Sequence, residues 1–170
     1  MSFPTKQRVQ TRYRPKDLQA MDAMDRKLLR ALQDDGRITN QALATRCGLS
    51  PAACFDRVKR LRASGYIVGY TALLDPVKLG RALMIFVEVL LDRTSDDVFA
   101  AFAAHVERLP EVLECHMVAG GFDYLLKVRV ADMAAYRVFL GSTLVDLPGI
   151  RETRTYAVLE EVKATTHLPI

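Results

Sequence analysis

Three short helical patterns, separated by two turn signals, occupy residues 25 to 65, and they constrain the fold more than any other feature of the chain. In the third pattern, Ser50 is a suitable N-cap and Pro51 stands at the first helical position, where a missing N–H costs nothing. Gly65 follows as the residue that ends this helix. Thr39 is the expected N-cap of the second helix, and Gly48 supplies a positive φ in the turn between the second and third helices. This order predicts a helix-turn-helix.

The apolar residues of the three patterns recur at helical spacing, so each helix is predicted to bury one face. They are Leu28, Leu29 and Leu32 in the first helix, Ala42 and Leu43 in the second, and Cys54, Val58 and Leu61 in the third. A different face of the third helix carries Ala53, Asp56, Arg57 and Arg60. Small residues followed by arginines suit the DNA major groove. The alternative is a small three-helix subdomain with a solvated basic face, because generic patterns of this kind give many false positives.

Charge is distributed unevenly along the chain. Through Asp75 there are 14 lysines and arginines against 7 acidic residues, whereas the remainder has 10 against 13. Positive charge therefore coincides with the helix-turn-helix, as expected for a surface that binds phosphates. Residues 1–20 contain five basic residues and no apolar centre, which excludes a secretory signal and predicts a flexible basic tail that adds modest phosphate affinity.

The second half of the chain alternates strand and helix patterns. The expected strands are residues 83–91, 112–119, 122–130 and 150–162, and the expected helices are 95–108 and 132–144. This βαββαβ order predicts an α+β protein with a ferredoxin-like C-terminal domain. The predicted divisions are a tail at 1–20, a DNA-binding domain at 21–65, a strand and linker at 66–80, an effector and oligomerisation domain at 81–165, and a C-terminal tail at 166–170.

The first and last of these strands are apolar on both sides, as in strands that are buried on both faces. Two helices cover one face of such a sheet, so the other face needs a second cover. The same sheet from a second chain would supply it and would form a two-fold dimer. Dimerisation would also pair two recognition helices on two half-sites of DNA.

Composition excludes several functional classes. Cys47, Cys54 and Cys115 form no CxxC and no even framework, which favours a reducing cytoplasm and small core cysteines. Cys115 and His116 would point to opposite faces of a strand, so no metal site is expected. No apolar run reaches the ~18 residues that span a membrane. No phosphate loop and no nucleophile with a suitably spaced base is present, so no enzymatic activity is expected.

The amino-acid sequence of the helix-turn-helix resembles that of the leucine-responsive/asparagine-regulator (Lrp/AsnC) family of bacterial and archaeal transcription factors. The matching segments are residues 25–29, 35–38, 48–51, 57–61 and 65–70, and the resemblance covers about residues 22 to 165. It implies a winged helix-turn-helix joined to an ACT-like, RAM-type ferredoxin-like domain. Together with helical position, it predicts that Ser50, Ala52, Ala53, Asp56, Arg57 and Arg60 face double-stranded DNA. It also implies dimers that assemble further, with an octamer as the expected form.

Residues 118–124 resemble the family's glycine-containing hairpin, beside which an amino acid effector binds between subunits. The resemblance assigns Gly120, Gly121 and Phe122 to a backbone cradle for the carboxylate and Asp123 to the ammonium group. Thr153 and Thr155 are expected in the pocket wall. The alternative is a plain hairpin turn hydrogen-bonded by Asp123.

Apolar residues around this turn favour leucine or another apolar amino acid as the effector, with no other cofactor. The leading prediction is a sequence-specific regulator of amino acid metabolism genes that responds to that effector. The alternatives are a DNA-wrapping architectural protein of broad specificity, and the regulatory subunit of an amino acid metabolic enzyme.

Overall fold

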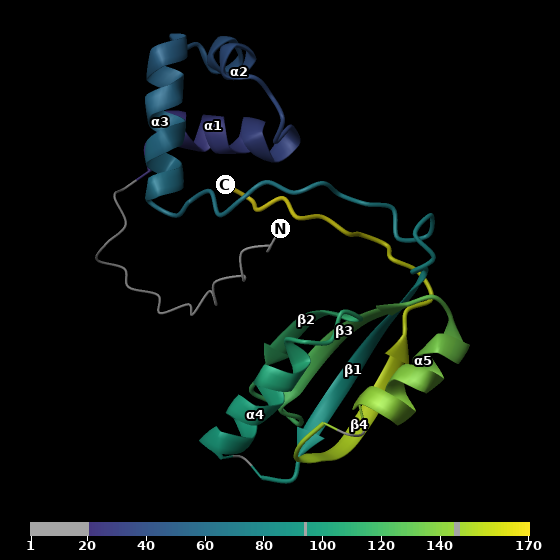
Figure 1. Ribbon diagram of the computed structural model, residues 1–170. Coiled ribbons are helices and arrows are strands. Elements are labelled where there is room, and N and C mark those ends of the chain that lie inside the picture. The colour runs from purple at the N-terminus through teal and green to yellow at the C-terminus, as the bar shows by residue number, and fades with distance from the viewer. Residues whose placement is uncertain (1–20, 94, 145–146) are drawn as a thin grey trace. The chain divides into compact units, whose positions relative to one another are not determined.

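The computed structural model describes residues 21–93, 95–144 and 147–170, which fall into two compact units (Figure 1). Unit 1 consists of the described residues up to Ala72 together with Thr165–Ile170, and unit 2 is Leu73–Ala164. The basic tail predicted for residues 1–20 lies outside the described residues. Among the described residues, no helix is long and apolar enough to cross a membrane.

Unit 1 contains the three predicted helices, α1 (Ala23–Asp34), α2 (Asn40–Cys47) and α3 (Pro51–Ala63). The side chains of Thr39 and Ser50 cap α2 and α3 as predicted, and Gly48 takes a φ of 75° in the turn between them. The fully buried side chains include Leu28, Cys54 and Leu61. In α2 the prediction was wrong at one position, because Ala44 is buried in place of Ala42.

The segment after α3 differs from the prediction. Residues 66–74 were predicted to form a strand, yet the described chain is extended there without strand pairing. The apolar residues of this segment are largely exposed, with Val68 at 91% and Leu73 at 80%. A β-forming sequence becomes a strand only when a second strand pairs with it, and no neighbouring strand is present in unit 1 among the described residues.

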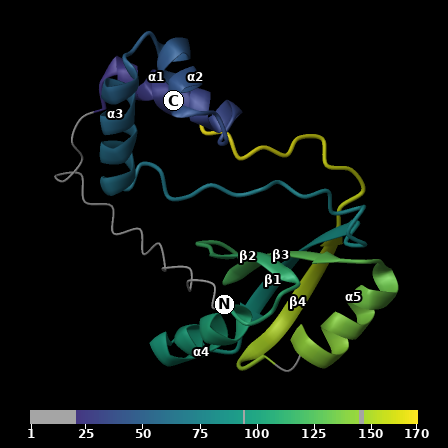
Figure 2. The same cartoon turned by 45° about the horizontal axis from the view of Figure 1, so that its top comes forward.

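Unit 2 has the predicted βαββαβ order. Its elements are β1 (Leu83–Leu91), α4 (Asp96–Val106), β2 (Val112–Met117), β3 (Tyr124–Val130), α5 (Met133–Phe139) and β4 (Ile150–Ala157). The strands form one antiparallel sheet in the order β2-β3-β1-β4, and α5 continues into a π-helical turn at Leu140–Leu144. Both helices cover the same face of the sheet, as Figures 1 and 2 show.

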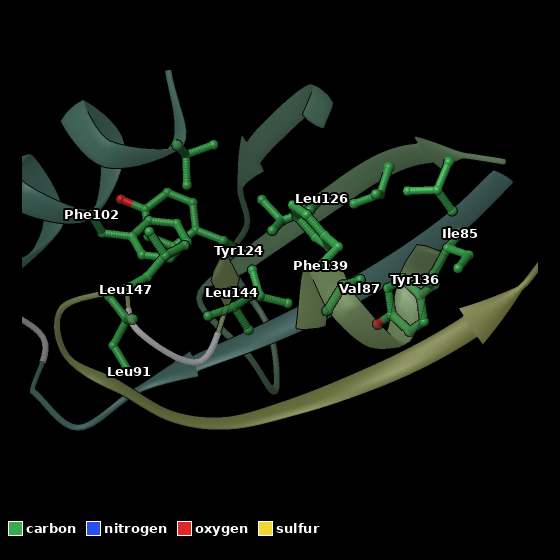
Figure 3. Packing of buried hydrophobic residues seen from close by; sticks show 14 residues of the cluster. Ile85, Val87, Leu91, Phe102, Tyr124, Leu126, Tyr136, Phe139, Leu144 and Leu147 are labelled. Carbon is green, nitrogen blue, oxygen red and sulfur yellow. The ribbon is translucent and has the colours of Figure 1, made fainter. Parts of the chain in front are cut away.

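The core of unit 2 lies between the sheet and these helices (Figure 3). Alternate residues of β1 and β3 point into it, including Val87 and Leu126, and Phe102 of α4 and Tyr136 of α5 close over them. Phe102 packs against Tyr124 with ring centroids 4.5 Å apart. Because strand side chains alternate, the other residues of each strand form a second face, which neither helix covers.

Three details of unit 2 correct the predictions. The last strand ends at Ala157, and Leu159 and Val162 beyond it are 100% and 88% exposed. Met133 is exposed at the start of α5, where the side chain lies outside the helix stripe that contacts the sheet. Cys115 is exposed because β2 is an edge strand, so it is not a core cysteine.

The C-terminal residues do not form a separate tail. The side-chain amide of Gln33 pairs with the backbone of Leu168, donating to its carbonyl at 3.1 Å and accepting from its N–H at 2.6 Å. Ile170 packs against the apolar cluster of unit 1. The chain therefore returns to α1 after β4, a contact that residues so far apart in sequence do not reveal by pattern.

Candidate DNA-binding and effector sites

The outward surface of α3 is the first candidate site. Ala52, Asp56 and Lys59 are exposed and recur at i, i+4 and i+7, so they share the side of the helix that lies away from the buried Cys54 and Leu61. The helix is held at its start by the Ser50 hydroxyl, which accepts from the Ala53 N–H at 3.2 Å. A second bond, from the Asn40 side chain to the Pro51 carbonyl at 2.8 Å, ties the start of α2 to that of α3.

The two arginines assigned to the DNA surface contact α1. Arg60 binds both carboxylate oxygens of Asp25 at 2.7 Å, and Arg57 binds Asp25 at 2.9 Å and Asp22 at 2.7 Å. The Asp25 side chain is only 3% exposed, whereas those of Arg57 and Arg60 are 31% and 47% exposed. Both arginines therefore lie at the edge of the outward surface, with their guanidinium groups directed toward α1.

The electrostatics of this cluster fit its geometry. The pKa of Asp22 is lowered, first by the hydrogen bond from the Asp25 backbone N–H and then by Arg57. The pKa of Arg57 is raised by the carboxylates of Asp22 and Asp25. Both aspartates also lie at the N-terminus of α1, where the helix dipole favours negative charge.

Sequence reasoning missed part of the exposed surface of α3. Phe55 is 58% exposed, and with Lys59, Arg62 and Tyr70 it borders a hollow that residues of α1, α2 and the turn between them also line. Its exposure had no sequence signal, because an aromatic residue inside a helical pattern is more often buried. The helical positions of Lys59 and Arg62 could have identified them as outward cations.

The turn between β2 and β3 is the second candidate site. The backbone of Asp123 closes it, accepting from Val118 N–H and donating to the Val89 carbonyl, both at 3.0 Å. Asp123 Oδ2 accepts from the Leu91 N–H at 2.8 Å. The carboxylate thus anchors the turn to β1, as the hairpin alternative requires. Among the described residues, only one of its two oxygens accepts a hydrogen bond.

Neither the backbone conformation nor the packing of the described residues requires glycine at positions 120 and 121. Neither Gly120 nor Gly121 has a positive φ, and a Cβ at either position would meet nothing within 4 Å. Within the described part of the chain, the N–H groups of Gly120, Gly121 and Phe122 have no hydrogen-bond partner. These features fit a close approach by a group from outside the chain.

A shallow hollow lies beside this turn on the face of the sheet that the helices leave open. It is lined by Glu88, Leu90, Gly121, Phe122, Glu152 and Arg154. Desolvation and a hydrogen bond with Glu88 raise the pKa of Tyr156 on the same face. The cation of Arg154 and the carboxylates of Glu88 and Glu152 therefore stand together where a zwitterion could bind. Sequence reasoning missed Glu152 and Arg154, because the pairing of β4 with β1 brings them to the turn.

The structure separates Thr153 and Thr155 from this hollow. They pair with Val89 and Val87, which point into the helix-covered core, and cross-strand partners share a face. The Thr155 hydroxyl lies 2.6 Å from the hydroxyl of Tyr136. The prediction that the two threonines line the same pocket as residues 120–123 is therefore not supported by their position, because strand alternation turns them to the opposite face.

No group of three or more His, Cys, Asp or Glu side chains that could hold a metal ion occurs among the described residues. His116 contacts Glu114 at 3.1 Å, and Glu114 also binds Lys127 at 2.9 Å. Lys127 and His116, in that order, lower the pKa of the Glu114 carboxyl. This cluster therefore forms an ion-paired part of the open sheet face.

Comparison with known families matches both units. Residues 21–68 match a model described as winged helix-turn-helix DNA-binding, and residues 84–168 match the Lrp/AsnC ligand binding domain. The leucine-responsive regulatory proteins of Salmonella typhimurium and Escherichia coli K12 are 54% and 53% identical over 163 residues. These alignments cover 95% of this chain and 98% of each relative.

Solved structures agree with the sequence comparison. A transcriptional regulator from Neisseria meningitidis in complex with L-Met has a TM-score of 0.84 at 39% identity, covering 88% of this chain and 97% of that one. The feast or famine regulatory protein of M. tuberculosis complexed with L-methionine has a TM-score of 0.79 at 37% identity. It covers 88% of this chain and 100% of that one.

Proposed function

Since this chain belongs to the Lrp/AsnC family of transcriptional regulators, we propose that it controls transcription by binding duplex DNA through α3. A free amino acid bound beside residues 120–123 tunes that binding. The protein acts in the cytoplasm and carries no enzymatic activity. Genes of amino acid metabolism are its expected targets.

The exposed, capped α3 is the observation that carries the DNA-binding proposal. Ser50, Ala52, Ala53 and Asp56 form the part of the surface that enters the major groove, and Arg57 and Arg60 add positive charge at its edge. The test is selection of bound sequences from a random duplex pool at physiological salt. Recovery of a defined motif supports a sequence-specific regulator. Recovery of no motif, with tight binding throughout, supports the DNA-wrapping alternative.

The free N–H groups of Gly120, Gly121 and Phe122 support an effector site at the turn. Backbone donors bind a carboxylate, while Asp123 and Glu88 or Glu152 on the open face are available to an ammonium group. Thr153 and Thr155 lie on the opposite face, so their proposed part is to hold β4 in place, with Thr155 bound to Tyr136. The related complexes with methionine and the leucine-responsive relatives favour an apolar amino acid, with leucine and methionine as first choices.

The site is expected to be completed by a second copy of the chain, because the open sheet face has an apolar centre. Phe86, Leu90 and Leu125 lie on that face with Tyr156 beside them. A face-to-face contact of two such sheets would bury these side chains and form the dimer. Assembly of dimers into an octamer is the expected final form.

Replacement of Phe86 by Glu tests the dimer. We expect the variant to sediment as a monomer at concentrations where the unchanged protein is dimeric, because each dimer would bury two unpaired carboxylates. Val138→Glu is the matched control, since Val138 is 67% exposed on α5, on the helix side of the sheet. A dimer that persists in Phe86→Glu but dissociates in Val138→Glu would place the interface on the helix side.

Two replacements of Asp123 separate effector binding from turn geometry. Asp123→Ala removes both the charge and the acceptor for the Leu91 N–H, whereas Asp123→Asn keeps an acceptor oxygen and removes only the charge. If the carboxylate binds the ammonium group, both variants should lose about 10- to 100-fold in affinity for leucine or methionine by calorimetry. DNA affinity without effector should stay within about twofold, because the coupling free energy between the two sites acts only when the effector is bound.

Two other outcomes would contradict the role proposed for Asp123 or the effector site itself. Retention of amino acid affinity by Asp123→Asn, with loss only in Asp123→Ala, would limit Asp123 to supporting the turn. Absence of binding by all twenty amino acids to the unchanged protein would refute the effector proposal itself.

A further inference from the structure

We propose that Asp25 is the positioning residue of the recognition helix: its buried carboxylate holds Arg57 and Arg60, so the outward face of α3 reads the bases and these two guanidinium groups do not. The inference rests on the proposed function, since α3 is a recognition helix only if the protein binds DNA. It adds a role for a residue of α1 that does not itself face DNA.

The geometry of the contact is that of a clasp between two helices. Asp25 Oδ1 accepts from Arg57 at 2.9 Å and from Arg60 at 2.7 Å, and Oδ2 accepts from Arg60 at 2.7 Å. Asp22 extends the clasp, because Oδ2 accepts from Arg57 at 2.7 Å and Oδ1 accepts from the Asp25 N–H at 2.7 Å. The N-cap residue Asp22 and the first-turn residue Asp25 of α1 therefore pair with two arginines of α3.

Because Asp25 is buried, its carboxylate constrains where its hydrogen-bond donors must lie. Asp25 is the buried charged residue of the described chain, and a carboxylate removed from water needs partners in defined positions. Both arginines come from the same side of α3, one turn apart. The carboxylate therefore fixes the rotation of α3 about its own axis and its position along α1. Apolar contacts such as those of Leu61 exclude water but tolerate more rotation.

The clasp engages the guanidinium group with which Arg60 would otherwise recognise a base. An arginine that recognises guanine presents its fork of N–H groups to the base. Nη2 of Arg60 already donates to both oxygens of Asp25, and its release would leave a buried carboxylate with fewer partners. The face at i, i+4 and i+7, which carries Ala52, Asp56 and Lys59, remains free for the groove.

The test compares Asp25→Asn, Arg60→Ala and the double variant on the selected motif and on a random duplex, over a range of salt concentrations. We expect both single variants to lose about 10- to 100-fold in affinity for the motif, the range that a hydrogen bond to a charged group supports. Affinity for the random duplex should change much less. The double variant should bind no worse than the weaker single variant, because each change disables the same contact.

The salt dependence distinguishes a positioning role from direct contact with DNA. Loss of a phosphate contact lowers the slope of log K against log salt by about one, whereas Asp25→Asn should leave the slope unchanged. Asp34→Asn is the matched control, since Asp34 pairs with Arg46 in the same unit but is half-exposed and away from α3. This control should bind both duplexes normally.

Other outcomes overturn the inference. Normal or tighter motif binding by Asp25→Asn, together with relaxed preference at one base in Arg60→Ala, would make Arg60 a base-reading residue. A salt slope reduced in Arg60→Ala alone would make it a phosphate contact. Where Asp25→Asn fails to fold, Arg60→Lys keeps the charge but ends one atom short of the Nη2 that contacts both oxygens of Asp25. Normal motif affinity in that variant would refute the clasp. Failure of the unchanged protein to select any motif refutes the proposed function instead, and the inference falls with it.

Discussion

Replacement of Ala52 by Asp is expected to reduce affinity for the selected DNA motif by at least about 100-fold. Ala52 is exposed at the second position of α3, on the side away from the core, so the new carboxylate would face the phosphates. Like charges brought together at an interface cost several kcal/mol, and each 1.4 kcal/mol is a factor of ten. In a dimer the penalty applies to both helices. Fluorescence anisotropy with labelled duplex measures the change.

The same substitution leaves the helix intact, which makes the result easy to interpret. A carboxylate in the first turn favours the helix through its dipole, so the unfolding midpoint should not fall. The matched control is Ala134→Asp, because Ala134 is also exposed at the second position of its helix, α5, in unit 2. DNA affinity should be normal in that control. Normal affinity in Ala52→Asp would exclude the outward face of α3 from the DNA contact.

Replacement of Phe102 by Ala is expected to destabilise unit 2 by about 3–5 kcal/mol, the usual cost of removing a buried aromatic side chain. Phe102 is fully buried between α4 and the sheet and contacts Tyr124 (Figure 3). This loss is a large fraction of the stability of a domain of such a size. Urea unfolding followed by circular dichroism measures it.

Hydrogen exchange locates the effect of this change. Amides of β1 and β3 should lose protection in Phe102→Ala while those of α1 keep it, because the units have separate apolar cores. Phe55→Ala is the control, since Phe55 is 58% exposed and its removal should change stability by less than about 0.5 kcal/mol. Equal loss of protection in α1 would show that the two units unfold together.

Local sequence patterns correctly predicted those helices, caps and strands whose formation depends only on residues close together in the sequence. Ser50 and Pro51 defined the start of α3, and Gly48 had the predicted positive φ, because caps and turns depend on adjacent residues. Strand β1 matched its prediction at both ends, since its apolar run, interrupted by Glu88, lies between the charged residues Arg81 and Asp92. The βαββαβ order followed from these local elements.

Predictions failed where a residue's partner is distant in the sequence. The segment at 66–74 has a strand-forming composition, but pairing needs a second strand and none lies beside it among the described residues. Thr153 and Thr155 were expected beside residues 120–123, and their register with Val89 and Val87 places them on the covered face, opposite the hollow at the turn. The exposure of Cys115 depends on the position of β2 at the sheet edge, which the strand order decides.

The sequence alone determined the two-part organisation and the capped start of α3, because periodicity, caps and charge are properties of neighbouring residues. Only the tertiary structure decided what Arg57 and Arg60 contact, since Asp25 lies more than thirty residues earlier and meets them only when α1 packs on α3. It likewise brought Arg154 and Glu152 of β4 to the turn at Gly121. Side chains acquire their electrostatic partners from packing, and packing joins residues that no local pattern connects.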